Sequence, residues 1–306
     1  MSTQLIKDLR ERSGAGMMDC KKALDAVGAD MEKAIDWLRK KGLASAAKKS
    51  GRIASEGLIA VATSGNAAAI IELNSETDFV ARNDQFQALA EDVAKQALNS
   101  ANDVEKLKTL KTSSGKTVGE AITAAIAMIG ENMNLRRTET LSVKQGVVAT
   151  YIHNAVKSGL GKIGVLVALE SSADKAKLEA LGKQIAMHVA AAKPEALNRE
   201  GVDASKLDRE RGVLREQALA SGKPAEVVEK MIEGRIRKYY EEVVLLDQLF
   251  VIDGKTKISD VVAAASKEAG APITLVGYVR FGLGEGIEKP VDDFAAEVAK
   301  AAGTAA

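Results

Sequence analysis

The chain has 306 residues, 46% of them hydrophobic and 3% aromatic, and its 43 Lys and Arg residues nearly balance its 42 Asp and Glu residues. This hydrophobic fraction is enough for two or three buried cores. The net charge of +1, together with only four Tyr and one Trp, disfavours direct binding of nucleic acid, because it leaves no field of one sign and few stacking surfaces.

Cysteine content and the length of apolar runs bear on the compartment. The single cysteine, Cys20, excludes an internal disulfide framework. The first residues, MSTQLIKDLRERSG, lack the apolar centre of a signal peptide, and no apolar run approaches the ~18 residues of a membrane span. We therefore expect a cytoplasmic protein that does not associate with membranes.

Residues 1–50 have the pattern of three short helices that each end near a glycine. Apolar residues of the second and third helices recur at helical spacing: Met17, Cys20, Leu24 and Val27, then Met31, Ala34, Ile35 and Leu38. Met18 lies off this apolar stripe, whereas Cys20 lies on it and is expected in a core. The stretch ASAAKKSGRIASEG that follows predicts a basic linker rich in small residues.

The middle of the chain contains a repeat. Residues 56–74 predict two strands joined by a tight turn, followed by a helix at 84–98. Residues 146–171 again predict strand, glycine-containing loop and strand, followed by a helix at 174–191. Two such units imply two related α+β subdomains. The remaining predicted elements are a helix and a third strand within 118–143 for the first subdomain, and a helix at 258–269 and a strand at 272–281 for the second.

Between the second unit and its last strand, a charged region predicts a projecting pair of antiparallel helices. Pro194 interrupts the preceding helix, and ASGKPAE supplies a turn with glycine before and proline after it. The seam of this coiled coil is predicted from 4-3-4-3 spacing at Ile232, Ile236, Tyr239, Val243 and Leu246. A hairpin of this kind can also pair with a second copy of the chain. The chain is predicted to end in a helix with the sequence VDDFAAEVAKAA.

Candidate catalytic residues are few. His188 lies on the apolar side of its helix and is expected to be a hydrogen-bonded core histidine, whereas His153, in the strand TYIHNAV, can face solvent or a partner. Neither has an acid or nucleophile beside it in a motif, and the glycine-rich stretches GAGMMD and FGLGEG match no phosphate-binding pattern. We therefore expect a protein that is not an enzyme and that has no cofactor or metal; an enzyme using either histidine remains the competing hypothesis.

The stretch ELNSETDFVARNDQF places Phe79 between a predicted strand and a predicted helix. If one helix ran unbroken from Thr77, then Phe79, Phe86 and Val93 would recur every seven residues on its buried face. Asn83 or Asp84 could instead cap a new helix and separate Phe79 from that face. Spacing alone narrowly favours a buried Phe79.

Several long motifs resemble the bacterial elongation factor Ts family, in the family's order and over essentially the whole chain. They are LRERSGAGMMDCKKAL, TDFVARNDQF, IAMHVAAAKP, SGKPAEVVEKMIEGRIRKYYEEV and VRFGLGEGIEK. The resemblance implies a guanine-nucleotide exchange factor that binds elongation factor Tu, both with GDP and without nucleotide, and promotes GDP release. An adaptor that only binds other proteins is the alternative.

The resemblance also implies the domain organisation of an α+β protein. Its parts are a three-helix, ubiquitin-associated-like module (1–50), a linker (51–56), two related subdomains of antiparallel sheet and helix (57–144, then 145–193 with 247–284), a protruding helical coiled-coil hairpin (194–246) and a C-terminal helical module (285–306).

Site residues follow from the same resemblance. Family members use the T-D-F-V motif to push against the partner's G domain and dislodge the Mg²⁺ that holds GDP, a role that falls here on Thr77, Asp78, Phe79 and Val80. Phe79 should then be exposed, against the spacing argument. Other partner contacts are expected at Met17 and Met18 in the helical module, near His153 in the second subdomain, and at Phe294 and Val298 in the C-terminal helix.

Overall fold

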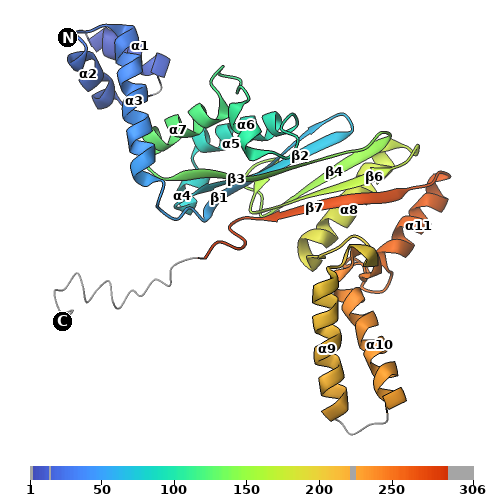
Figure 1. Ribbon diagram of the computed structural model, residues 1–306. Helices are drawn as coiled ribbons and strands as arrows, with labels where there is room; N and C mark the ends of the chain where they lie inside the picture. Colours follow the sequence, from blue (N-terminus) through green and yellow to red (C-terminus); the bar gives the residue numbers. More distant parts are fainter. Residues whose placement is uncertain (1–2, 14, 221–224, 289–306) are drawn as a thin grey trace, which may run out of the picture.

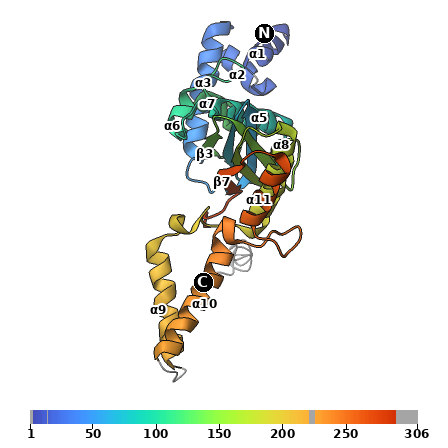
Figure 2. The same ribbon diagram turned by 90° about the vertical axis from the view of Figure 1, so that its right-hand side faces the viewer.

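The computed structural model describes residues 3–13, 15–220 and 225–288 (Figure 1). An N-terminal helical module lies at one end, two sheets with flanking helices form the body, and a helical arm projects from the other end. Figure 2 shows the same arm extending away from the body in a view turned by 90°. The predicted C-terminal helix, with Phe294 and Val298, lies outside the described residues.

The N-terminal module consists of helices α1 (Thr3–Ser13), α2 (Met17–Ala26) and α3 (Met31–Lys49). Asp30 caps α3, because its side chain accepts a hydrogen bond from the backbone N–H of Lys33. The core of the module is made of fully buried residues: Leu9, Cys20, Ala23, Leu24 and Ala34. The expected core position of Cys20 is confirmed.

Helix α3 is longer than predicted and includes the first residues, 44–49, of the stretch expected to be a linker. Alanine is the strongest helix former, so the run from Ala44 to Ala47 continues the helix. Gly42 is buried, and a Cβ added there would lie 3.4 Å from the Cβ of Ala127 on helix α7 (Val118–Ile129). This close approach packs α3 on the body and leaves only a short connection to the first strand.

The first sheet is antiparallel and has the order β3-β2-β1-β5. Its strands are β1 (Glu56–Ser64), β2 (Ala67–Ser75), β3 (Met133–Ser142) and the two-residue β5 (Leu160–Gly161). The helices around this sheet are α4 (Asp78–Ala81), α5 (Asp84–Ala97), α6 (Val104–Thr109) and α7. Strand β5 was not predicted. It lies in the loop of the second hairpin but pairs with β1, because Leu160 is fully buried in the core of the first subdomain.

The second sheet has the order β4-β6-β7 and is also antiparallel. It consists of β4 (Gly146–His153), β6 (Ile163–Glu170) and β7 (Thr274–Gly282), with helices α8 (Lys175–Ala192) and α11 (Ile258–Ala269) packed on it. The two sheets pack face to face through a shared cluster that includes Ile59, Ile70, Val148, Leu166 and Phe281. The body is therefore layered helix, sheet, sheet, helix, and the predicted α+β fold class is confirmed.

The arm is formed by α9 (Ala204–Ala220) and α10 (Ala225–Val243), with short 3₁₀ helices at its base, η1 (Arg199–Gly201) and η2 (Leu245–Asp247). Its apolar seam consists of Leu207, Leu214, Val228, Ile232, Ile236 and Tyr240. The predicted heptad continuation through Tyr239 and Leu246 is wrong. On α10 the seam residues follow one another at a spacing of four, and the last of them is Tyr240. Leu246 packs instead in the core of the second subdomain.

A buried glutamate connects the end of the described chain to the first sheet. Glu72 on β2 is fully buried and accepts hydrogen bonds from Arg136, Arg137 and the backbone N–H of Gly284. Gly284 has φ +71°, and a Cβ there would lie 2.5 Å from the carbonyl oxygen of Ser55. The glycine-rich stretch FGLGEG therefore serves a tight turn against the first subdomain.

Candidate functional site

The candidate site is the Phe79 loop, defined as residues 75–83, which connects β2 to α5. Phe79 is 75% exposed, whereas the next two residues, Val80 and Ala81, are only 5% and 6% exposed and belong to the core of the first subdomain. The four-residue helix α4 is thus fixed by one side and presents an aromatic ring to solvent on the other.

The preference of spacing alone for a buried Phe79 is wrong, and the cause is Asn83. Its side chain accepts hydrogen bonds from the backbone N–H groups of Gln85 and Phe86, so a new helix begins at Asp84. Asn83 itself has an extended backbone conformation, which interrupts the helical phase. Phe86 is fully buried on α5, but Phe79 belongs to a separate helix and does not share that face.

The N-terminal side of the loop is attached to the connection between α7 and β3. The carboxylate of Glu131 accepts hydrogen bonds from both the backbone N–H (2.9 Å) and the hydroxyl (2.6 Å) of Thr77. In return, the carboxylate of Glu76 accepts a hydrogen bond from the backbone N–H of Asn132. The Asn132 side chain donates to the carbonyl of Arg52 at 2.7 Å. We call Glu76, Thr77, Glu131 and Asn132 the clamp.

The C-terminal side of the loop is held by backbone contacts. Arg82 N–H donates to the Phe79 carbonyl at 3.1 Å, and the Gln87 side chain donates to the Ala81 carbonyl at 3.0 Å. Asp78 lies 3.5 Å from the guanidinium of Arg82, but both side chains are largely exposed, so this ion pair adds little stability. Its carboxylate is accessible to a partner.

The other predicted contact residues lie on separate surfaces. Met17 and Met18 are 43% and 65% exposed on α2, which Figure 1 places apart from α4. His153 is exposed at the end of β4, and its Nδ1 lies 3.0 Å from the hydroxyl of Tyr151. The structure therefore gathers Thr77, Phe79 and their supports into one site and leaves the other contacts distributed along the molecule.

His188 is fully buried, as predicted, and both ring nitrogens have partners. The backbone N–H of Val251 donates to Nδ1 at 3.2 Å, so Nδ1 is an acceptor and Nε2 carries the hydrogen that Gln248 accepts at 2.8 Å. Burial lowers the pKa of His188. A neutral histidine in this arrangement links α8 to the loop that follows the arm.

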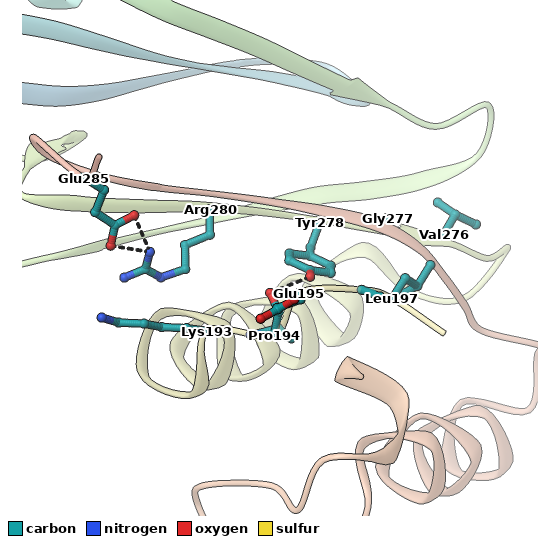
Figure 3. Close-up of a pocket in the computed structure, with 10 residues that line it drawn as sticks. Lys193, Pro194, Glu195, Leu197, Val276, Gly277, Tyr278, Arg280 and Glu285 are labelled. Carbon is teal, nitrogen blue, oxygen red and sulfur yellow. Dashed lines mark hydrogen bonds and ion pairs between the residues drawn. The ribbon is translucent and has the colours of Figure 1, made fainter. Parts of the chain in front are cut away.

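A cavity of about 670 Å³ lies between β7 and the connection from α8 to the arm (Figure 3). The Tyr278 hydroxyl donates to the carbonyl of Pro194 at 2.8 Å, and burial raises the pKa of Tyr278 to about 12. The Arg280 Nη1 contacts both carboxylate oxygens of Glu285, at 2.8 and 2.9 Å. The Tyr278 hydrogen bond attaches β7 to the connection between α8 and the arm, whereas the Arg280–Glu285 pair holds the turn that follows β7. None of the predicted site residues line this cavity.

Sequence reasoning missed Glu131 and Asn132. They lie more than fifty positions from Glu76 and Thr77, and no spacing rule connects the two segments. The only local signal for Glu131 is weak: it directly follows Gly130, the left-handed C-cap of α7. In the part of the chain that the structure describes, no group of three or more His, Cys, Asp and Glu residues is arranged to hold a metal ion. No helix there is long and apolar enough to cross a membrane.

Comparison with known proteins places this chain among the translation elongation factors. It belongs to the elongation factor Ts family, whose model, described as "Elongation factor TS", matches residues 76–285. The chain is 62% identical over 304 residues to elongation factor Ts of Rhodospirillum centenum, covering 99% of each chain. It is 62% identical to the Rhodospirillum rubrum protein, covering 98% of this chain and 97% of that one. It is 60% identical to the Paramagnetospirillum magneticum protein, covering 99% and 98%.

Proposed function

We propose that this protein is a guanine-nucleotide exchange factor for elongation factor Tu and that Phe79 is the residue that acts on the partner's nucleotide site. The observation that carries the proposal is the exposure of Phe79 on a short helix fixed from both sides. Burial of a phenylalanine side chain is worth about 1.5–3 kcal/mol, which this position forgoes in the free protein. A partner surface that receives the ring would recover that free energy.

Exchange needs no reacting side chain in this protein. In the partner, Mg²⁺ neutralises phosphate oxygens of GDP, so a small displacement of its ligands weakens nucleotide binding strongly. In our proposal Phe79 enters the G domain and causes that displacement, and the Asp78 carboxylate contacts the same surface. Val80 is buried, so its part is to anchor α4 on the core. Thr77 sets the start of α4 through the clamp.

The free energy of exchange must come from the whole interface. Nucleotide binding with a nanomolar Kd corresponds to about 12 kcal/mol. Linkage requires that GDP weaken the binding of the exchange factor by the same ratio by which the exchange factor weakens the binding of GDP. Contacts at several surfaces supply that free energy best. Met17, Met18 and His153 are exposed and available for this role. Self-association through the arm stays a prediction.

The test is the release rate of a fluorescent GDP analogue from elongation factor Tu. We expect the wild-type chain to accelerate release and Phe79→Ala to reduce that acceleration by about 30-fold, the effect of removing a ~2 kcal/mol contact. Ile252→Ala is the matched control, because Ile252 is 55% exposed but lies in the second subdomain. A wild-type chain that binds elongation factor Tu without accelerating release would favour the adaptor alternative.

A further inference from the structure

We infer that Glu131 is a positioning residue for nucleotide exchange: through Thr77 it holds α4 in the orientation that presents Phe79. This inference rests on the proposed function of Phe79. It assigns a role to a residue of the β3 side of the subdomain, which need not touch the partner at all.

The first argument is the geometry of the carboxylate. One oxygen of Glu131 accepts from the Thr77 N–H at 2.9 Å and the other from the Thr77 hydroxyl at 2.6 Å. Thr77 is the N-cap of α4, yet its side chain makes no hydrogen bond to the helix, because the hydroxyl donates to Glu131 instead. Both polar groups of the cap residue that could set the helix direction are thus bound to Glu131.

The second argument is that α4 cannot orient itself. A helix of four residues forms too few internal hydrogen bonds to offset the cost of nucleation, so its orientation must come from outside contacts. Val80 and Ala81 fix the end that enters the core. The clamp fixes the other end: beside the pair formed by Thr77 and Glu131, the backbone N–H of Asn132 donates a further hydrogen bond to the Glu76 carboxylate.

The third argument is the exposed ring itself. A free phenylalanine side chain on a loosely held loop gains free energy by folding back onto neighbouring apolar surface. The clamp opposes that movement and keeps the ring available, which lowers the ordering cost when a partner binds. If the clamp is weakened, only a fraction of molecules present Phe79, and the effect of the ring falls in proportion to that fraction.

The inference predicts a separation between rate and binding. Contacts made by the helical module and the second subdomain do not depend on the clamp. We therefore expect Glu131→Gln to lower the maximal rate of GDP-analogue release at saturating factor by about 10-fold, the loss expected when hydrogen bonds to a charged group are replaced by weaker neutral ones. The half-saturating concentration should change by less than about 3-fold, since most of the interface is intact.

The experiment uses the full chain and elongation factor Tu loaded with the fluorescent GDP analogue. Glutamine keeps the size of the side chain but removes its charge: its oxygen accepts from the Thr77 N–H, and its amide nitrogen can only donate to the Thr77 hydroxyl oxygen, so charge-assisted hydrogen bonds become weaker neutral ones. Thr77→Val removes the hydroxyl and should lower the maximal rate as Glu131→Gln does. The double variant Glu131→Gln with Thr77→Val should be no slower than the slower single variant. The matched control is Glu139→Gln, which removes a half-buried glutamate on β3, the strand that follows Glu131, and should be silent.

Two results would overturn the inference. One is a wild-type maximal rate in Glu131→Gln. The other is a Glu131→Gln effect of equal size in the Phe79→Ala background, since that would mean that Glu131 acts independently of the ring. Circular dichroism and thermal unfolding establish that each variant is folded.

A measurement on the free protein distinguishes a failure of the proposed exchange function from a failure of the inference about Glu131. Exchange of the Thr77 amide hydrogen with solvent should be at least about 10-fold faster in Glu131→Gln than in the wild type, and unchanged in Glu139→Gln. If wild type does not accelerate release but the amide result holds, the clamp stands as a structural fact and the exchange role fails. If the amide exchanges equally in both proteins, Glu131 does not hold the loop and the inference is wrong.

Discussion

The carboxylate of Glu72 accepts a hydrogen bond from the backbone N–H of Gly284 at 2.8 Å, across 212 positions of sequence. Glu72 lies on the first sheet, whereas Gly284 is the second residue after β7 of the second sheet. Arg137 joins the same group: its Nε donates to Glu72 at 2.6 Å, its Nη2 donates to the Gly282 carbonyl at 2.9 Å, and its guanidinium stacks on Phe281 at 4.1 Å. One buried acid thus connects the two subdomains.

Glu72→Gln should therefore destabilise the protein. The substitution leaves Arg136 and Arg137 without their buried counter-charge, and breaking a buried ion pair by removing one partner costs about 3–5 kcal/mol. We expect a loss of that order in the free energy of unfolding in urea. Glu139→Gln on β3 is the control and should change it by less than about 0.5 kcal/mol. A Glu72→Gln protein as stable as the control would show that the charge is not required.

His188 should make stability depend on pH below neutrality. Burial lowers its pKa from the ordinary value of about 6.5, so the folded state favours the neutral ring. Protonation would also turn Nδ1 of His188, which accepts the hydrogen bond from the Val251 N–H, into a donor. The stability that this site contributes is present above about pH 6.5, where both states are neutral, and is lost as the pH falls, because the unfolded state binds the proton first.

The measurement is the free energy of unfolding across this pH range for the wild type and for His188→Gln. The wild type should lose stability more steeply than His188→Gln on acidification. An NMR titration of the His188 ring checks the same point without a substitution at that position. A ring that titrates at or above its ordinary pKa would contradict the prediction.

Tyr240 and Tyr239 have different surroundings in the arm. Tyr240 packs on the seam between α9 and α10, and the guanidinium of Arg199 lies 5.1 Å from its ring centroid. Tyr239 lies outside that seam. Tyr240→Ala should cost about 2–4 kcal/mol in the local stability of the arm, measured by hydrogen exchange of α9 and α10 amides, whereas Tyr239→Ala should cost less than half as much. Equal effects would restore the heptad seam that spacing predicted.

Met18 should affect affinity without affecting the maximal exchange rate, given the proposed function. Its side chain is 65% exposed on the helical module, remote from α4. Met18→Glu places a charge on an apolar contact and should raise the half-saturating concentration of factor by about 10-fold or more. Lys22→Glu, at another exposed position of α2, is the control for charge alone. A fall in the maximal rate would indicate that the module takes part in displacing the nucleotide.

The long periodic segments of this chain were predictable. Helices α5, α7 and α8 and the paired strands of both sheets follow from apolar spacing, because each buries one face against a neighbour and the spacing records that face. Their ends were less predictable. Helix propensity favours the alanine-rich continuation of α3, but the packing of Gly42 against α7 is a contact that no local pattern contains.

For the site, the sequence alone contained two incompatible indications. Heptad spacing favoured burial of Phe79, whereas the resemblance of the motif required its exposure, and only the position of the Asn83 cap decides between them. The clamp was not predictable, since Glu131 reaches Thr77 only after the chain has returned through α5, α6 and α7.

The propensities and apolar spacing of neighbouring residues therefore account for the helices, the strands and the arm as a helical hairpin. They also account for the core positions of Cys20 and His188. Tertiary structure decided the rest: the pairing of β5 with the first sheet, the seam of the arm, the burial of Glu72 between two subdomains and the exposure of Phe79. The physical reason is that each of these depends on partners distant in the chain, whose approach is set by the packing of whole elements and not by the residues on either side.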